Sequence, residues 1–275
     1  TGLNPLQYIV GDLVFVAVFK MNVAGAALAT ILAQLVSVVM SLAIIKKQQF
    51  PFHFSKKDIC FTSEIRNFLK VGFPIALQEF LTNISFLILC AIINGMGLEA
   101  SSGYGIARKV VSFIMLIPSS LMQSMSAFVA QNVGAGKEDR ARKAMRTGML
   151  LGVTIGIFVS ALSFFRGDIP SALFTGNQAF IARSAEYLKG FAPEAILTCL
   201  VFSYIGYFNG HGKTIPVMVQ GISASFLVRV PLSYLFSIQK GATLTTIGYA
   251  VPLASVYGII FFTICYLVFL RKMKK

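Results

Sequence analysis

Residues 71–93 read VGFPIALQEFLTNISFLILCAII, and this stretch decides the class of fold. It is long enough to cross the roughly 30 Å hydrocarbon core of a bilayer as a helix, and its only charged residue is Glu79. An open sheet edge cannot be satisfied in lipid, and a barrel strand would be about 10 residues of alternating polarity. The stretch therefore predicts a membrane-spanning helix.

Apolar runs of this kind recur along the whole chain. The expected spans are Leu3–Phe19, Val23–Ile45, Val71–Ile93, Val110–Ala130, Met149–Phe165, Tyr187–Phe208, Ile215–Phe236 and Ile247–Leu270. Only 12% of the residues are charged, against about 25% in soluble domains, and the mean hydropathy is +0.77. The sequence predicts an all-α polytopic membrane protein of about eight helices, and excludes soluble enzymes, DNA-binding proteins and disordered chains.

Basic residues alternate between the connections. There are 24 Lys and Arg against 10 Asp and Glu, a net charge of +14. They gather after the second and fourth expected spans and in the C-terminal tail, as Lys46, Lys47, Lys56, Lys57, Lys137, Arg140, Arg142, Lys143, Arg271 and Lys272. The positive-inside rule makes these connections and the C-terminus cytoplasmic, in a plasma (inner) membrane. The surplus charge indicates topology and a lipid bilayer as partner, and no nucleic acid.

The first two expected spans resemble the last two. Asp12-Leu13-Val14-Phe15, a turn and then residues 23–30 parallel Pro231-Leu232-Ser233-Tyr234, a turn and then residues 247–254. Parallel repeats of this kind are typical of two-lobe transporters. We expect four parts: the end of a first lobe (1–46), a cytoplasmic linker (47–70), a second lobe of about six helices (71–270) and a basic tail (271–275). Most of the first lobe would then precede Thr1.

Three stretches resemble the multidrug and toxic compound extrusion (MATE) transporters. Gly11 to Gln34 is similar to the fifth and sixth helices of that family, Gly72-Phe73-Pro74-Ile75-Ala76-Leu77-Gln78-Glu79 to the start of the seventh, and Gln123 to Arg142 to the eighth and its cytoplasmic loop. The resemblance covers essentially the whole chain. It implies part of helix five through helix twelve of a two-lobe antiporter. Such an antiporter exports small cationic amphipathic molecules by alternating access, in exchange for H⁺ or Na⁺ and without any other cofactor.

Three acids lie within the expected spans: Asp12, Glu79 and Glu194. A charge in the hydrocarbon core costs several kcal/mol, so each is a functional candidate by default. Glu79 shares a polar stripe with Gln78, Thr82 and Asn83, which should face the lobe interior. Glu194 follows Pro193, where we expect a kink. A buried carboxylate can exchange a proton or hold Na⁺, but each acid could equally be a structural hydrogen-bond partner between helices.

The resemblance adds positions for these acids. The Na⁺-coupled branch of the family has carboxylates on helices seven and ten, at positions that match Thr82 and Thr198 here. Glu79 and Glu194 each lie about one turn earlier. Asp12 falls on the helix-five aspartate, which belongs to a proton or cation site in the first lobe.

Arg229 is the one base expected deep in a span. It could pair with an acid or snorkel to the interface, and its depth favours the pairing. Gln78, Asn83, Gln123 and Thr198 are further polar candidates for a substrate cavity. The two histidines, His53 and His211, lack ligand-spaced partners, so no metal site is expected.

Two alternatives to multidrug antiport stay open. A lipid-linked oligosaccharide flippase of the same superfamily would show more basic residues along its cavity. An integral membrane enzyme would need a clustered catalytic set, such as paired histidines or an Asp-rich motif, and the sequence contains none. The sequence thus favours a transporter over an enzyme.

Overall fold

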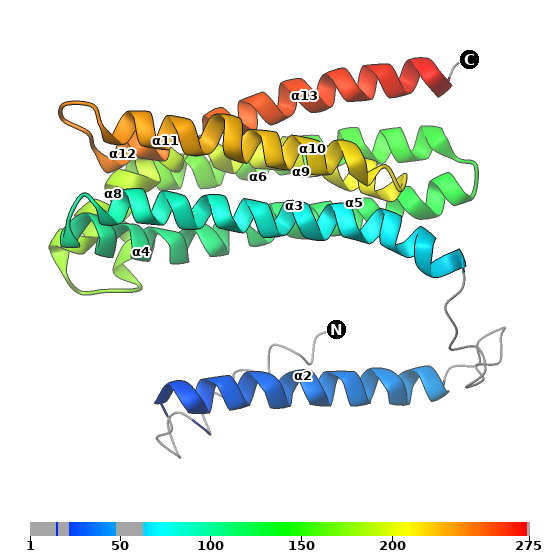
Figure 1. Ribbon diagram of the computed structural model, residues 1–275, viewed down its shortest axis with the longest axis horizontal. Helices are drawn as coiled ribbons and strands as arrows, with labels where there is room; N and C mark the ends of the chain where they lie inside the picture. The colour runs from blue at the N-terminus through cyan, green and yellow to red at the C-terminus, as the bar shows by residue number, and fades with distance from the viewer. Residues whose placement is uncertain (1–14, 16–21, 48–62, 274–275) are drawn as a thin grey trace. The chain divides into compact units, whose positions relative to one another are not determined.

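A computed structural model describes residue 15 and residues 22–47 and 63–273 of the chain (Figure 1). The chain divides into two compact units, Thr1–Phe61 and Thr62–Lys275. In the first unit, helix α2 (Asn22–Lys47) covers the expected span Val23–Ile45. The expected span Leu3–Phe19, and Asp12 with it, lies outside the described residues except for residue 15.

The second unit is a bundle in which the long helices run alongside one another (Figure 1). Its elements are α3 (Ser63–Asn94), α4 (Leu98–Ile114), α5 (Leu116–Gly134), α6 (Glu138–Arg166), α7 (Asp168–Ala172), α8 (Gln178–Phe191), α9 (Glu194–Gly210), α10 (Thr214–Ser223), the π-helix η3 (Ala224–Arg229), α11 (Val230–Ser237), α12 (Leu244–Gly248) and α13 (Ala250–Met273).

The predicted all-α polytopic architecture is confirmed. Within the described residues, five helical stretches are long and apolar enough to cross a membrane, and the bent pair α8–α9 makes up to six. These stretches coincide with the expected spans from Val71 onward. Several helices begin before the apolar run that predicted them and include polar residues at that end. Helix α3 begins at Ser63, and helix α6 begins at Glu138.

Helices α8 and α9 meet at a bend of 49°. Pro193 stands at the junction, as the N-cap of α9. Its ring offers no N–H and clashes with the carbonyl four residues earlier, which prevents a straight helix. The kink predicted here is confirmed, and it makes Glu194 the first residue of α9.

A second break, which the sequence analysis did not predict, lies between α10 and α11. Residues Ala224–Arg229 form a π-helix, and the N–H of Val230 donates to the carbonyl of Ser225, five residues back. Pro231 follows and has no N–H to donate to the carbonyl four residues before it. π-Helical turns are frequent at functional sites because they redirect side chains.

Helix α6 packs closely on α9 through a row of glycines. Gly148, Gly152 and Gly156 are buried and lie four residues apart. A Cβ atom on Gly152 would lie 2.8 Å from the Cβ of Cys199, and one on Gly156 would lie 2.7 Å from the carbonyl oxygen of Ala195. Small residues at this spacing let two transmembrane backbones approach. They hold α9, and so Glu194, against α6.

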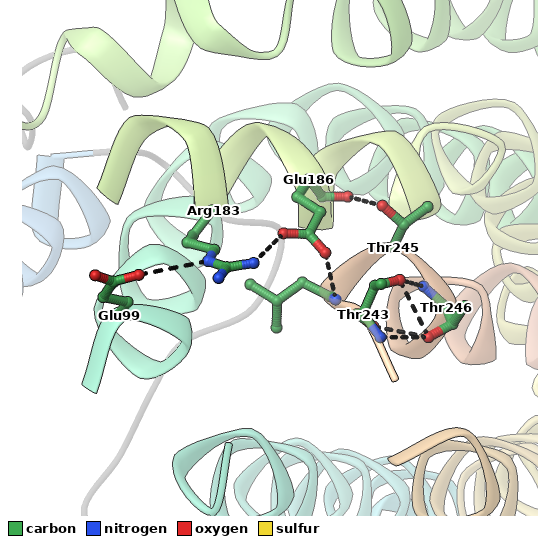
Figure 2. A network of polar contacts seen from close by, with 7 residues as sticks. Glu99, Arg183, Glu186, Thr243, Thr245 and Thr246 are labelled. Atoms are coloured by element: carbon green, nitrogen blue, oxygen red, sulfur yellow. Dashed lines mark hydrogen bonds and ion pairs between the residues drawn. The ribbon is translucent and has the colours of Figure 1, made fainter. Parts of the chain in front are cut away.

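A polar network ties α4, α8 and α12 together at one end of the bundle (Figure 2). Arg183 Nη1 donates to Glu186 Oε2 at 3.0 Å, and the backbone N–H of Leu244 donates to Glu186 Oε1 at 2.9 Å. Arg183 Nε also lies 3.8 Å from Glu99 Oε2. The connections that contain Gly97 and Ala242 therefore meet at the same end, where both border one pocket.

A different cluster joins α6 to α9 at the opposite end (Figure 1). The hydroxyl of Tyr207 donates to Glu138 Oε1 at 2.6 Å, and His211 Nε2 lies 3.0 Å from Glu138 Oε2. His211 Nδ1 lies 2.8 Å from the carbonyl oxygen of Tyr207. Both ring nitrogens thus lie within hydrogen-bond distance of oxygen atoms, which ties the end of α9 to the start of α6.

Candidate functional site

A cavity of about 270 Å³ lies inside the second unit, where α3, α5, α9, α10, η3 and α13 converge. Its walls mix apolar side chains with an unusual number of polar ones for the middle of a membrane bundle. The polar lining residues are Gln78, Glu79, Thr82, Asn83, Ser119, Glu194, Thr198, Asn209, Gln220, Ser225, Arg229 and Ser255.

Glu194 is the most deeply placed acid of the cavity, with 6% of its surface exposed. Its Oε1 atom accepts hydrogen bonds from the hydroxyls of Thr198, at 2.5 Å, and Ser255, at 2.8 Å. Its Oε2 atom has no partner among the described residues. One carboxylate oxygen is thus fixed by the protein, and the other is left to interact with whatever enters the cavity.

Glu79 lines the same cavity from α3 and is exposed. Its neighbours Gln78, Thr82 and Asn83 line the same cavity, so the whole polar stripe of α3 borders it. Gln78 lies directly over Gly221 of α10, where an added Cβ would come 2.8 Å from Gln78 Nε2. The absence of a side chain at Gly221 is therefore what makes room for the amide.

Arg229 enters the cavity from the π-helix. Its Nη1 atom donates to the Ser85 hydroxyl at 2.8 Å, and its guanidinium carbon lies 4.2 Å from the centre of the Phe86 ring. The expected ion pair with an acid is therefore wrong for the described part of the chain, where Arg229 uses a hydroxyl and a cation–π contact instead. The guanidinium bridges η3 to α3 without neutralising Glu194 directly.

Buried polar atoms without partners concentrate at this cavity. Among the described residues with such side-chain atoms, five line it: Thr82, Glu194, Asn209, Ser225 and Arg229. Buried polar atoms in native proteins almost always have a partner, which can be protein, water or ligand. The cavity is therefore equipped to bind ions or polar groups that come from outside the chain.

The structure brings most of the predicted site residues to one place. Gln78, Glu79, Asn83, Glu194, Thr198 and Arg229 all line the cavity. Gln123 does not, although its neighbour Met122 does, because successive helical residues point about 100° apart.

Sequence reasoning missed Asn209, Gln220, Ser225 and Ser255, which also line the cavity. Each is an uncharged polar residue within or at the end of an apolar span, and such a residue is a weaker signal than a charge. The signal that could have found Ser225 is its position one helical turn before Arg229 in the same span.

A bundle of membrane-length helices that surrounds a cavity with one buried acid, one exposed acid and a base is an integral membrane protein with an intramembrane polar site. Comparison with known proteins gives the family. The MatE family model matches residues 74–235, and the chain belongs to this family.

Relatives and solved structures agree with the assignment. The chain is 23% identical to the probable multidrug resistance protein YoeA of Bacillus subtilis over 87% of this chain and 54% of the relative. It is 26% identical to the multidrug export protein MepA of Staphylococcus aureus over 88% of this chain and 52% of the relative. The chain thus spans about half the length of the curated relatives it matches.

The fold is that of solved MATE structures. A multidrug resistance MATE family transporter of the MOP superfamily, in an outward-facing conformation, superposes with a TM-score of 0.85 and 19% identity, over 95% of this chain and 59% of that one. A MOP superfamily transporter from Pyrococcus furiosus gives a TM-score of 0.84 at 18% identity, over 95% of this chain and 60% of that one.

Proposed function

We propose that this chain forms the C-terminal part of a cation-coupled multidrug antiporter, in which its second unit is one of two lobes. The names of relatives such as YoeA and MepA support multidrug export. The observation that carries the proposal is the single cavity that is lined by both Glu194 and Glu79. The other lobe would be the first one, and residues 1–46 of this chain would form the end of it.

The two acids supply the coupling chemistry. Glu194 offers a free carboxylate oxygen in a buried setting, where gaining a proton or a cation removes the penalty of an uncompensated charge. Glu79 is exposed toward the same space and can exchange its ion with water. Binding of H⁺ or Na⁺ would stabilise one state of an alternating-access cycle and its release the other. Asp12 is a further candidate for the first lobe.

Small cationic amphipathic molecules are the proposed substrates. The acids attract positive charge, and Met122, Phe202 and Ile205 give the cavity an apolar wall. Methionine and aromatic side chains adapt to ligands of different shape. Gln78, Asn83 and Thr198 can orient a bound molecule by hydrogen bonds.

Dye efflux by the full-length protein tests the proposal. Cells or proteoliposomes that contain it should export a cationic dye, and the rate should depend on a Na⁺ gradient at fixed pH or on a pH gradient without Na⁺. Transport independent of both gradients would reject cation coupling. Transfer of a labelled lipid-linked oligosaccharide between leaflets, without dye export, would favour the flippase alternative. Arg229 is the one base among the described lining residues, which favours the multidrug reading.

A further inference from the structure

A groove of about 580 Å³ runs between α5 and α6, separate from the polar cavity. Its walls are largely apolar. Leu121 and Phe128 of α5 and Leu151 of α6 line it, and Phe128 and Leu151 are exposed. Both helices belong to stretches that are long and apolar enough to span a membrane. An apolar groove on such helices offers the right surface for an acyl chain.

Two basic residues, Arg140 and Lys143, line the same groove. Both are exposed, and neither forms an ion pair within the part of the chain that the structure describes. At this helix end, Arg142 lies 3.5 Å from Glu138 and 3.9 Å from Asp139. The groove therefore has two basic side chains that form no ion pair with a described carboxylate.

The charged and apolar parts follow one another along one face of α6. Arg140, Lys143, Thr147 and Leu151 lie three or four residues apart, the spacing of neighbours on one helix face. The basic pair lies in the first two turns of the helix, and Leu151 lies about two to three turns nearer the middle of the span. A phospholipid has the same arrangement, because its charged headgroup lies at the membrane surface and its apolar acyl chain lies below it.

We propose that this groove is a binding site for an anionic phospholipid. Arg140 and Lys143 bind the phosphate, which suits a planar guanidinium and a point ammonium charge. The acyl chain lies along Leu121, Phe128 and Leu151, and Thr147 lines the passage between the two parts. Basic pockets between transmembrane helices hold anionic headgroups in this way.

Retention of lipid by the purified full-length protein tests the proposal. The protein is incubated with equal amounts of phosphatidylglycerol and phosphatidylcholine in detergent, and the bound lipid is measured by native mass spectrometry. The parent should retain phosphatidylglycerol in preference. Arg140→Gln with Lys143→Gln should bind it about thirtyfold more weakly, the change for loss of two basic residues at a membrane surface.

A double variant, Arg146→Gln with Lys213→Gln, is the matched control. It removes the same two residue types, both exposed at the same end of the bundle and absent from the groove lining, and it should retain lipid as the parent does. Thr147→Trp keeps both charges but fills the passage, and should also reduce retention. Equal losses in the control and the groove variant would overturn the proposal. So would undiminished binding by Thr147→Trp, or equal displacement of the lipid by inorganic phosphate, because then no acyl site is involved.

Discussion

Glu194 and Glu79 face the same cavity from settings that differ in burial, and that difference makes their replacement informative. Glu194→Gln and Glu79→Gln should each abolish ion-driven efflux by the full-length protein, because an amide can neither release a proton nor neutralise a cation. A neutral amide costs less to bury than a charge, so the thermal unfolding temperature should not fall. Efflux of a cationic dye and thermal unfolding in detergent check both halves.

Glu99→Gln is the matched control for these variants, because Glu99 is exposed at the end of the bundle and does not line the cavity. It should export dye like the parent. A joint loss of activity and stability in Glu194→Gln would mean that the acid only holds α9 to α13 through Ser255. If Glu79→Gln kept parental efflux together with its Na⁺ or pH dependence, coupling would fall to Asp12 and the first lobe.

His211 provides a second prediction for single side chains. Its ring is 5% exposed and lies between Glu138 and the carbonyl of Tyr207. His211→Ala removes both of these polar contacts and should lower the free energy of unfolding by about 1–3 kcal/mol. Thermal unfolding measures the change, with exposed Lys213→Ala on the same connection expected within about 0.5 kcal/mol of the parent. A His211 variant as stable as the Lys213 control would show that the cluster contributes nothing.

The sequence predicts the location of the charged groups better than it predicts their partners. Glu79, Glu194 and Arg229 could be nominated because a charge inside an apolar run has few explanations. The contact of Arg229 with Ser85 and Phe86 could not, because it depends on which helix lies opposite, and these residues are far apart in sequence. The position of Gln123 could not be predicted either, because it depends on how α5 is rotated about its axis: Met122 lines the cavity, and the next residue points about 100° away.

At the scale of helices, we expect the glycine row of α6 to be required for its close packing against α9. Gly156→Leu would force a side chain against the carbonyl of Ala195, only 2.7 Å from an added Cβ. Overpacking of this kind costs about 1–3 kcal/mol, so the variant should unfold at lower temperature and lose the correct approach of α9. Fluorescence-detected size exclusion after heating measures it. Gly105→Leu is the control, because nothing lies within 4 Å of a Cβ built there. Equal unfolding temperatures for Gly156→Leu and Gly105→Leu would show that the close approach of α6 and α9 is not needed for stability.

The two breaks in the helices differ in how visible they are in the sequence. The bend before Glu194 could be predicted because Pro193 removes a backbone donor whatever surrounds it. Pro231 carries the same signal, yet the outcome there is a π-helix whose hydrogen bonds shift to the fifth residue. Local sequence shows that a regular helix is interrupted, but the packing of α10 and α11 against α3 and α13 decides how the interruption is resolved.

At the scale of the whole molecule, the bundle and the distribution of basic residues together predict which connections lie on which side of the membrane. The connections with Gly97 and Ala242 lie at one end, and those with Gly136 and His211 at the other. With the positive-inside rule, cysteines placed at Gly97 and Ala242 should react with an impermeant maleimide from outside the cell. Cysteines at Gly136 and Lys274 should react only after permeabilisation. Labelling of Gly97 and Gly136 from the same side would contradict both the charge rule and the bundle.

Architecture was largely predictable from composition because the bilayer allows so few structures. The length of each apolar run indicated the spans, and the runs from Val71 onward are matched by membrane-length helices. The convergence of α3, α9 and η3 on one cavity could not be predicted from the sequence, because the periodicity of one span does not tell which other span it packs against. The predicted division into an end of one lobe, a linker and a second lobe stays a prediction.

The π-helix has an evolutionary consequence. A π turn holds one residue more than the α turn it replaces, so it is equivalent to a single-residue insertion in a helix. Relatives whose corresponding span is α-helical throughout should therefore carry one residue fewer between Gln220 and Ser233. An ancestor that acquired this residue would have turned the side chains on one side of it by about 100° relative to those on the other. One such event would be enough to bring Arg229 onto the cavity while the flanking helices kept their neighbours.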